Sequence, residues 1–218
     1  MRLDPALFIV APVFLLSVIA HECAHALAAL GCGDPTARDR GRITLNPLPH
    51  VHPIGSIALP ALLLLLRSPV LIGWAKPVPI DGARLRDPRN DSVKIALAGP
   101  LANLLLALAC ACLARFAPHS GFFAPLRDMG LAGVVINCAL GIFNLIPVPP
   151  LDGSWVVMRF LRLRHIVVLH EFRFVGLLLV AALVMWPVTS HIVLHAPLRL
   201  AVRATLGLFG VRDVGVAL

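Results

Sequence analysis

The chain has 218 residues, of which 59% are hydrophobic, and its mean hydropathy is +0.89. This composition lies far above the globular norm and indicates a polytopic membrane protein, here a single domain over residues 1–218. The net charge of +8 does not indicate nucleic-acid binding, because Lys and Arg cluster between apolar runs without interleaved aromatic residues. We therefore expect no nucleic-acid partner and contacts with the lipid bilayer.

The first apolar run, residues 6–30, is long enough at about 1.5 Å per residue to cross a hydrocarbon core. Within it, His21 and His25 are four residues apart, so a helix places both imidazoles on one face, where they can bind one Zn²⁺. Glu22 follows the first histidine and can reach a water bound to that ion, which completes an HExxH pattern. Because an unpaired carboxylate in a bilayer is costly, Glu22 is predicted to be functional.

The next segments are irregular. An apolar/polar alternation over residues 41–47 predicts a short strand or β-hairpin. His50 and His52 follow, and we interpret them as loop residues at the headgroup boundary, with an extra metal ligand or a residue lining the entrance to the site as the alternative. Residues 54–75 are apolar but contain prolines, a glycine and an arginine, which makes this run a poor membrane span.

Residues 93–116 form a good span that carries the sequence AGPLAN. Its Gly99-Pro100 pair permits the close approach of a neighbouring helix. Asn103 places an amide in the membrane interior. Two roles stay open for this amide, an interhelical hydrogen bond and a role in catalysis.

The run 130–160 begins as a span and then meets NLIPVPPLDG, from Asn144 to Gly153. Three prolines in four positions cannot continue a regular helix, so the backbone must open where it packs on protein or lines a cavity. Asp152 lies in this segment. A carboxylate is the ligand that a two-histidine zinc site lacks, so Asp152 is a candidate third ligand.

The C-terminal part contains a further span at 174–193 and a dozen residues, 197–208, that we expect to form a partial or interfacial helix. The prediction is an all-α polytopic membrane protein with about five to six membrane segments, one of them re-entrant. We place its core at about 6–160 and accessory helices at about 161–218. The five cysteines lie mostly in apolar runs without a CxxC pair and are expected to be buried thiols.

Depth in the membrane predicts the topology. If the first and fourth runs were antiparallel, His21 and Asp152 would differ in depth by on the order of 20 Å and could not share an ion. Parallel runs need an odd number of crossings between them, so 54–75 should be re-entrant or lie against the site, and 93–116 should cross once. This arrangement puts most basic loop residues on the cytoplasmic side, the N-terminus outside and the site nearer the cytoplasm.

Together these motifs resemble the site-2 protease family of intramembrane zinc metalloproteases, in the small bacterial type without a PDZ or CBS domain. The resemblance implies that His21, His25 and Asp152 bind one Zn²⁺ and that Glu22 is the catalytic base. It makes Asn144 a candidate contact for the oxyanion or the substrate, and Asn103 a helper near the core.

The expected function is therefore hydrolysis of peptide bonds in or near transmembrane segments of a membrane-protein substrate, in a multi-pass protein of the bacterial cell membrane. A catalytically idle relative that binds membrane proteins and a zinc transporter are the alternatives. The intact Glu22 argues against the idle relative. A transporter would need several sites along a path or internal repeats, and the sequence shows neither. The oligomeric state is not predicted.

Overall fold

The structure is a computed structural model that describes residues 5–66, 75–162, 165–166, 169 and 173–211. These residues form helices and turns without a strand, so the predicted all-α class is confirmed. Three of the described helices are long and apolar enough to cross a membrane, namely α1 (Pro5–Gly31), α4 (Pro88–Phe116) and α5 (Ala124–Asn144).

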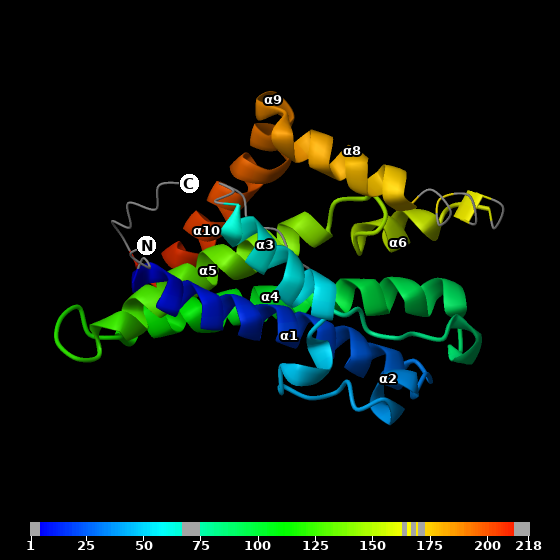
Figure 1. Ribbon diagram of the computed structural model, residues 1–218, viewed down its shortest axis with the longest axis horizontal. Coiled ribbons are helices and arrows are strands. Elements are labelled where there is room, and N and C mark those ends of the chain that lie inside the picture. Colours follow the sequence, from blue (N-terminus) through cyan, green and yellow to red (C-terminus); the bar gives the residue numbers. More distant parts are fainter. Residues whose placement is uncertain (1–4, 67–74, 163–164, 167–168, 170–172, 212–218) are drawn as a thin grey trace.

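The three long helices pack side by side, with α4 in contact with both α1 and α5, and α1 also in contact with α5. Small side chains such as Ala26, Ala107 and Ala111 are completely buried, which lets the helix backbones approach closely. Figure 1 shows that α1 and α5 run in the same direction and α4 in the opposite one. The parallel arrangement predicted for the first and fourth apolar runs is thus present.

The loop after α1 contains the short helix α2 (Thr36–Asp39) and the single turn η1 (Leu48–His50). The predicted strand or hairpin at 41–47 is wrong, because these residues form turns and bends. One physical reason is that side chains bind a backbone carbonyl of this segment. The carbonyl of Thr44 accepts hydrogen bonds from the Cys23 thiol at 3.0 Å and the His50 imidazole at 2.9 Å, so it is not available to a partner strand.

The apolar run at 54–75, predicted from its sequence to be a poor membrane span, begins with a π-helical turn, η2 (Pro53–Ala58), and a short helix, α3 (Leu59–Leu65). Residues 67–74, the rest of this run up to Ala75, lie outside the described residues. The backbone N–H of Lys76 donates to the carbonyl of His50 at 2.8 Å, so the chain returns to the point from which it left. The two ends of the run therefore meet, and its path through the membrane stays a prediction.

After α5, the chain continues through α6 (Gly153–Met158) and α8 (Arg173–Met185). It ends in α9 (Pro187–Ser190), the π-helical turn η4 (His191–His195) and α10 (Ala196–Leu208). Residues 178–185 and 187–208 meet at a bend of 89°, so the described residues contain three candidate spans, or up to four if this bent pair counts as one. The predicted five to six segments are not confirmed, because the broken runs yield helices too short to cross on their own.

The predicted partial helix at 197–208 corresponds to α10, and it packs against protein. Its buried face, with Leu198, Val202 and Leu206, joins a core cluster with residues of α4 and α5. The basic side chains Arg199 and Arg203 are exposed on the remaining surface of the helix. The C-terminal helix therefore closes the side of the α4–α5 pair.

Candidate metal centre

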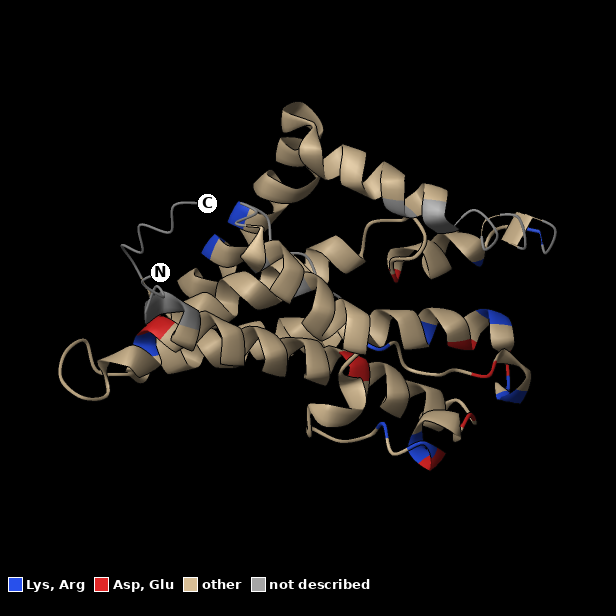
Figure 2. Cartoon of the chain, viewed as in Figure 1, with Lys and Arg blue, Asp and Glu red and all other residues tan. Residues whose placement is uncertain are grey.

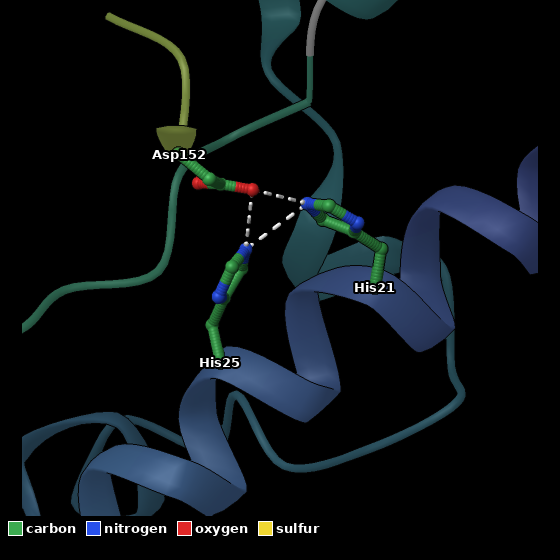
Figure 3. Close-up of side chains that lie close together, drawn as sticks. All are labelled: His21, His25 and Asp152. Carbon is green, nitrogen blue, oxygen red and sulfur yellow. Dashed lines mark hydrogen bonds and ion pairs between the residues drawn. The ribbon is translucent and has the colours of Figure 1, made fainter. Parts of the chain in front are cut away.

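Three side chains from distant parts of the sequence meet at one point (Figure 3). Nε2 of His21 and Nε2 of His25, both on α1, lie 3.2 and 3.3 Å from Oδ2 of Asp152, which immediately precedes α6. The two Nε2 atoms are 3.0 Å apart, with the imidazole rings nearly perpendicular at 86°. Among the described residues, this is the group of His, Cys, Asp and Glu side chains with the geometry to hold a metal ion.

Each imidazole is held from behind by an oxygen atom of α4. Nδ1 of His21 lies 2.6 Å from Oδ1 of Asn103, and Nδ1 of His25 lies 2.7 Å from the carbonyl oxygen of Ile95. Because carbonyl and amide oxygens can only accept a hydrogen bond, both Nδ1 atoms act as donors. Each neutral ring then presents the lone pair of Nε2 to the point where the three side chains meet.

The donor set suits a cation. Two Nε2 lone pairs and the Asp152 oxygen face one another, and this buried oxygen has no hydrogen-bond donor of its own. Zinc–ligand distances near 2.0–2.1 Å in tetrahedral geometry place two ligand atoms about 3.3 Å apart. The distances of 3.0, 3.2 and 3.3 Å match that spacing, so a small divalent ion can sit among the three atoms.

Helix α4 can approach the two imidazoles because it carries a glycine there. A Cβ atom at Gly99 would lie 2.5 Å from Cε1 of His21 and 2.5 Å from Nε2 of His25. The next residue, Pro100, has no N–H and leaves the carbonyl of Ala96 without its intrahelical donor, which loosens this turn. The close approach predicted for the Gly99-Pro100 pair is confirmed, and the neighbour is the metal centre itself.

Asp152 is held by the fold of the proline-rich segment that precedes it. Helix α6 begins at Gly153, and a side chain there would collide with the carbonyl of Leu145 at the end of α5. The far end of α6 is tied to α4, because the guanidinium of Arg89 donates to the carbonyls of Arg159 at 2.6 Å and Leu161 at 3.1 Å. The carboxylate thus comes from a segment fixed at both ends.

Glu22 lies beside the three ligand atoms in one cleft of about 430 Å³. Its Oε2 accepts a hydrogen bond from the backbone N–H of Val78 at 3.2 Å. Val78 belongs to a stretch without helix, 75–81, that leads into the turn η3 (Gly82–Arg84). The volume falls within the range of about 300–1,000 Å³ typical of ligand sites.

The other candidates occupy different places. Asn144, the last residue of α5, lines the cleft, and its Nδ2 donates to the carbonyl of Leu140 at 2.9 Å. Asn103 is completely buried behind His21 and does not line the cleft. His50 and His52 are outside the ligand group, since the His50 imidazole contacts Thr44 and Nδ1 of His52 accepts from the N–H of Gly55. His50 is buried in the turn η1, His52 directly precedes η2, and neither lines the cleft, so their interpretation as residues at the headgroup boundary stays a prediction.

Two residues with a place in this network were not singled out from the sequence. Asn137 of α5 and Ser17 of α1 are buried and hydrogen-bonded to Asn103. An isolated amide in an otherwise apolar span is the same signal that pointed to Asn103, so Asn137 could have been found. The N–H of Val78 carries no such signal, because every residue except proline has one.

The class of protein that this centre defines agrees with the comparison to known families. The profile described as Peptidase family M50 matches residues 120–187, which confirms the predicted resemblance to the zinc metalloproteases of the site-2 protease family. The matched region includes Asp152 and the proline-rich segment. His21 and His25 lie outside it.

Curated proteins resemble the chain over a longer region. "Putative zinc metalloprotease YwhC" of Bacillus subtilis is 36% identical over 149 residues, which cover 66% of this chain and 64% of YwhC. "Putative zinc metalloprotease Rip2" of Mycolicibacterium smegmatis is 36% identical over 143 residues, which cover 64% of this chain and 52% of Rip2. The chain thus spans between about half and two thirds of the length of these relatives. No protein of known structure matches it.

Proposed function

We propose that this protein is an intramembrane zinc metalloendopeptidase that hydrolyses peptide bonds in or near transmembrane segments of membrane-protein substrates. The observation that carries the proposal is the convergence of His21, His25 and Asp152 beside Glu22 in one cleft. The names of the curated relatives support zinc as the metal and proteolysis as the reaction. These three protein ligands would hold zinc and would leave a fourth coordination position for water or substrate, as in catalytic zinc sites.

The metal and the protein have separate tasks in this proposal. Zinc, when bound, supplies Lewis-acid chemistry that lowers the pKa of a coordinated water to about 7 and polarises the scissile carbonyl. Glu22 accepts the proton of the attacking water and passes it to the leaving amide nitrogen. The N–H of Val78 holds one carboxylate oxygen of Glu22 and so orients the base toward the cleft.

Two asparagines have different roles. Asn144 lines the cleft, and we assign it to contact with the substrate carbonyl as negative charge develops there. Its Nδ2 carries two N–H groups, one of which donates to the carbonyl of Leu140, and the other is the donor assigned to the substrate. Asn103 is completely buried and touches His21, so it is a positioning residue that does not meet the substrate.

The substrate class follows from where the site lies. His21 and His25 are in the second half of α1, a candidate membrane span, so a peptide bond must reach them at membrane depth. The carbonyl groups of a transmembrane helix are bonded within that helix, so the substrate must unwind locally before attack. A cleft that opens between α1, the stretch 75–81 and the end of α5 has room for such an unwound segment.

The proposed location is the bacterial cell membrane, with the metal centre nearer the cytoplasm. Figure 2 shows many of the Lys and Arg residues gathered at the end of the stack where α1 ends and α4 begins. Cytoplasmic loops are enriched in these residues, which supports this orientation. A smaller group, including Arg115 and Arg127, lies at the opposite end of α4 and start of α5.

Two substitutions test the function. Glu22→Gln is expected to keep zinc bound but to lower cleavage by at least about a hundredfold, because the amide cannot accept the proton. Asp152→Ala is expected to lose the metal as well as activity, because it removes one of three ligands. Metal analysis of the purified proteins, beside a cleavage assay with a membrane-protein substrate, measures both effects.

The same experiment separates the alternatives. A Glu22→Gln protein that cleaves as fast as the unchanged chain would end the proposed mechanism. An unchanged chain that binds zinc but cleaves no substrate would favour the idle relative. Zinc uptake into proteoliposomes would indicate a transporter.

A further inference from the structure

A hydrogen-bonded network of buried polar side chains from α1, α4 and α5 lies behind the candidate metal centre. Its members, Asn103, Asn137 and Ser17, are at most 2% exposed, although each lies on a candidate membrane span. We infer that Asn137, supported by Ser17, is a positioning residue that prepares His21 for metal binding by fixing the orientation of the Asn103 amide. The inference rests on the proposed metal centre and adds two residues to it.

The first step is the Asn103 amide. Its Oδ1 accepts from Nδ1 of His21 at 2.6 Å, and its Nδ2 donates to Oδ1 of Asn137 at 2.9 Å and to the backbone carbonyl of Ser17 at 3.5 Å. Both acceptors on the Nδ2 side are oxygens. The amide can therefore present only its oxygen atom to His21 without losing these bonds.

The second step is the Asn137 amide, which fixes the donor-to-acceptor direction of these hydrogen bonds. Its Nδ2 donates to the backbone carbonyl of Gly133 at 2.9 Å and to Oγ of Ser17 at 2.9 Å. The Ser17 hydroxyl in turn donates to the carbonyl of Val13 at 2.8 Å. A backbone carbonyl can only accept, so rotating the Asn137 amide by half a turn would place two oxygens against each other. Its oxygen must then face Asn103.

The consequence reaches the metal centre. With Asn103 fixed, the proton of neutral His21 resides on Nδ1, and Nε2 keeps the lone pair that faces Asp152. A reversed Asn103 amide would offer an N–H group to Nδ1 and favour the proton on Nε2, where it blocks metal binding. His25 needs no such network of side chains, because its Nδ1 contacts the backbone carbonyl of Ile95 directly.

A merely structural role for Asn137 makes a different prediction. If this amide only holds α4 and α5 together, its loss lowers stability whether or not Asn103 is present. If it acts through Asn103, its effect on zinc affinity disappears once Asn103 is gone. A double-mutant cycle on zinc affinity distinguishes these cases.

We propose to measure the zinc dissociation constant of the full chain in detergent, for the unchanged protein, Asn137→Ala, Asn103→Ala and the double variant. Asn137→Ala is expected to raise this constant about tenfold, as is typical when a partner behind a histidine ligand is removed. In the Asn103→Ala background, Asn137→Ala should have no further effect. The matched control is Thr205→Val, a buried polar-to-apolar change against Cys138 on α5, which should leave zinc affinity unchanged.

Equal effects of Asn137→Ala in both backgrounds, or an unchanged affinity in the single variant, would overturn the inference. If Asn137→Ala does not fold, Ser17→Ala replaces it in the same cycle. Ser17→Ala removes one acceptor of the Asn137 amide and leaves the other, the Gly133 carbonyl. We therefore expect the zinc dissociation constant to rise about two- to threefold, which is less than the tenfold rise expected for Asn137→Ala.

Cobalt in place of zinc gives an independent measurement. The visible absorption of bound Co²⁺ should change in Asn137→Ala and stay unchanged in Thr205→Val. No measurement in this series uses proteolysis, so the positioning role can fail while the protease survives. Conversely, a zinc-binding chain without protease activity would leave the positioning role intact.

Discussion

At the scale of single residues, each proposed ligand of the candidate metal centre is held in one orientation by its neighbours. The imidazoles are fixed by oxygens on α4, and the carboxylate is fixed by the fold around Gly153. No bulky side chain fits between α4 and the two rings, which is why Gly99 occupies that position. Ligand geometry here depends on small, close contacts, and single methyl groups are expected to matter.

Gly99→Ala tests this dependence. The added Cβ would lie 2.5 Å from an atom of each imidazole, so the rings or α4 must shift. Because a displacement of about 1 Å at a reacting centre can cost about a hundredfold in rate, we expect cleavage to fall by that order, with weaker zinc binding. Cleavage rate and zinc content of the purified variant measure the effect.

Gly141→Ala is the matched control. The methyl group it adds on α5 would meet Pro100 at 3.6 Å and Asn103 at 3.7 Å, which are ordinary contacts. Its activity should stay within about twofold of the unchanged chain, because the added methyl group fits at this buried position without displacing a neighbour. Similar losses in both variants would show that α4 packing in general, and not the contact with the imidazoles, is responsible.

At the scale of elements, the stretch 75–81 has no helix of its own and is positioned by neighbours. The guanidinium of Arg42 donates to the carbonyls of Lys76 and Pro77, and the N–H of Val78 donates to Glu22. At its end, the N–H of Asp81 donates to Oδ2 of Asp34 at 2.7 Å. The loop after α1 thereby holds the segment that orients the proposed base.

Asp34 makes this connection sensitive to acid. Burial raises the pKa of its carboxyl group, but hydrogen bonds from Thr36 and from the Asp81 N–H outweigh burial and hold the pKa below its usual value. A lowered pKa in the folded state stabilises the fold above the unfolded pKa of about 3.9, and this stabilisation is lost as pH falls through the folded pKa. Stability should therefore depend on Asp34 at neutral pH and not in strong acid.

Asp34→Asn tests this pH dependence. The unchanged chain should have a higher thermal midpoint than the variant from pH 7 down to about 5, and the difference should shrink below about pH 4. Asp39→Asn, which removes a carboxylate paired with the exposed Arg38, should change the midpoint little at any pH. A difference between Asp34→Asn and the unchanged chain that stays constant into strong acid would contradict the assignment.

At the scale of the whole molecule, the direction of three helices decides whether a site can form. Because α1 and α5 run the same way (Figure 1), the second half of α1 and the segment after α5 lie at the same end of the stack. His21 and Asp152 are 131 positions apart in sequence and 3.2 Å apart in space as a result. The hydrogen bond from the N–H of Lys76 to the carbonyl of His50 brings together the two ends of the run between α1 and α4.

The proposed orientation can be tested with impermeant thiol reagents on intact cells. Ser120, in the exposed turn between α4 and α5, should lie outside, and Arg40, in the loop after α1, should face the cytoplasm. In a background without Cys32, Ser120→Cys should be labelled directly and Arg40→Cys only after permeabilisation. The reverse pattern would place the metal centre nearer the outer face.

The sequence by itself determined which ionisable side chains lie within apolar runs and therefore need a partner. The meeting of His21, His25 and Asp152 beside Glu22 could be predicted because an ionisable side chain in lipid needs a partner, and the HExxH spacing brings two imidazoles onto one helix face. The all-α class followed from long apolar runs. The parallel order of the first and fourth runs followed from the depth at which the ligands must meet.

Only the tertiary structure decided the features that depend on packing between distant segments. The hairpin at 41–47 was wrongly predicted in part because the Cys23 and His50 side chains bind the carbonyl of Thr44, a long-range contact that an alternating sequence pattern does not reveal. The number of spans could not be obtained from hydropathy, since a short apolar run can re-enter, bend or pack on protein. The place of Asn137 behind His21 likewise depends on α5 lying against α1 and α4, and hydrogen bonds between helices are set by that packing and not by local sequence.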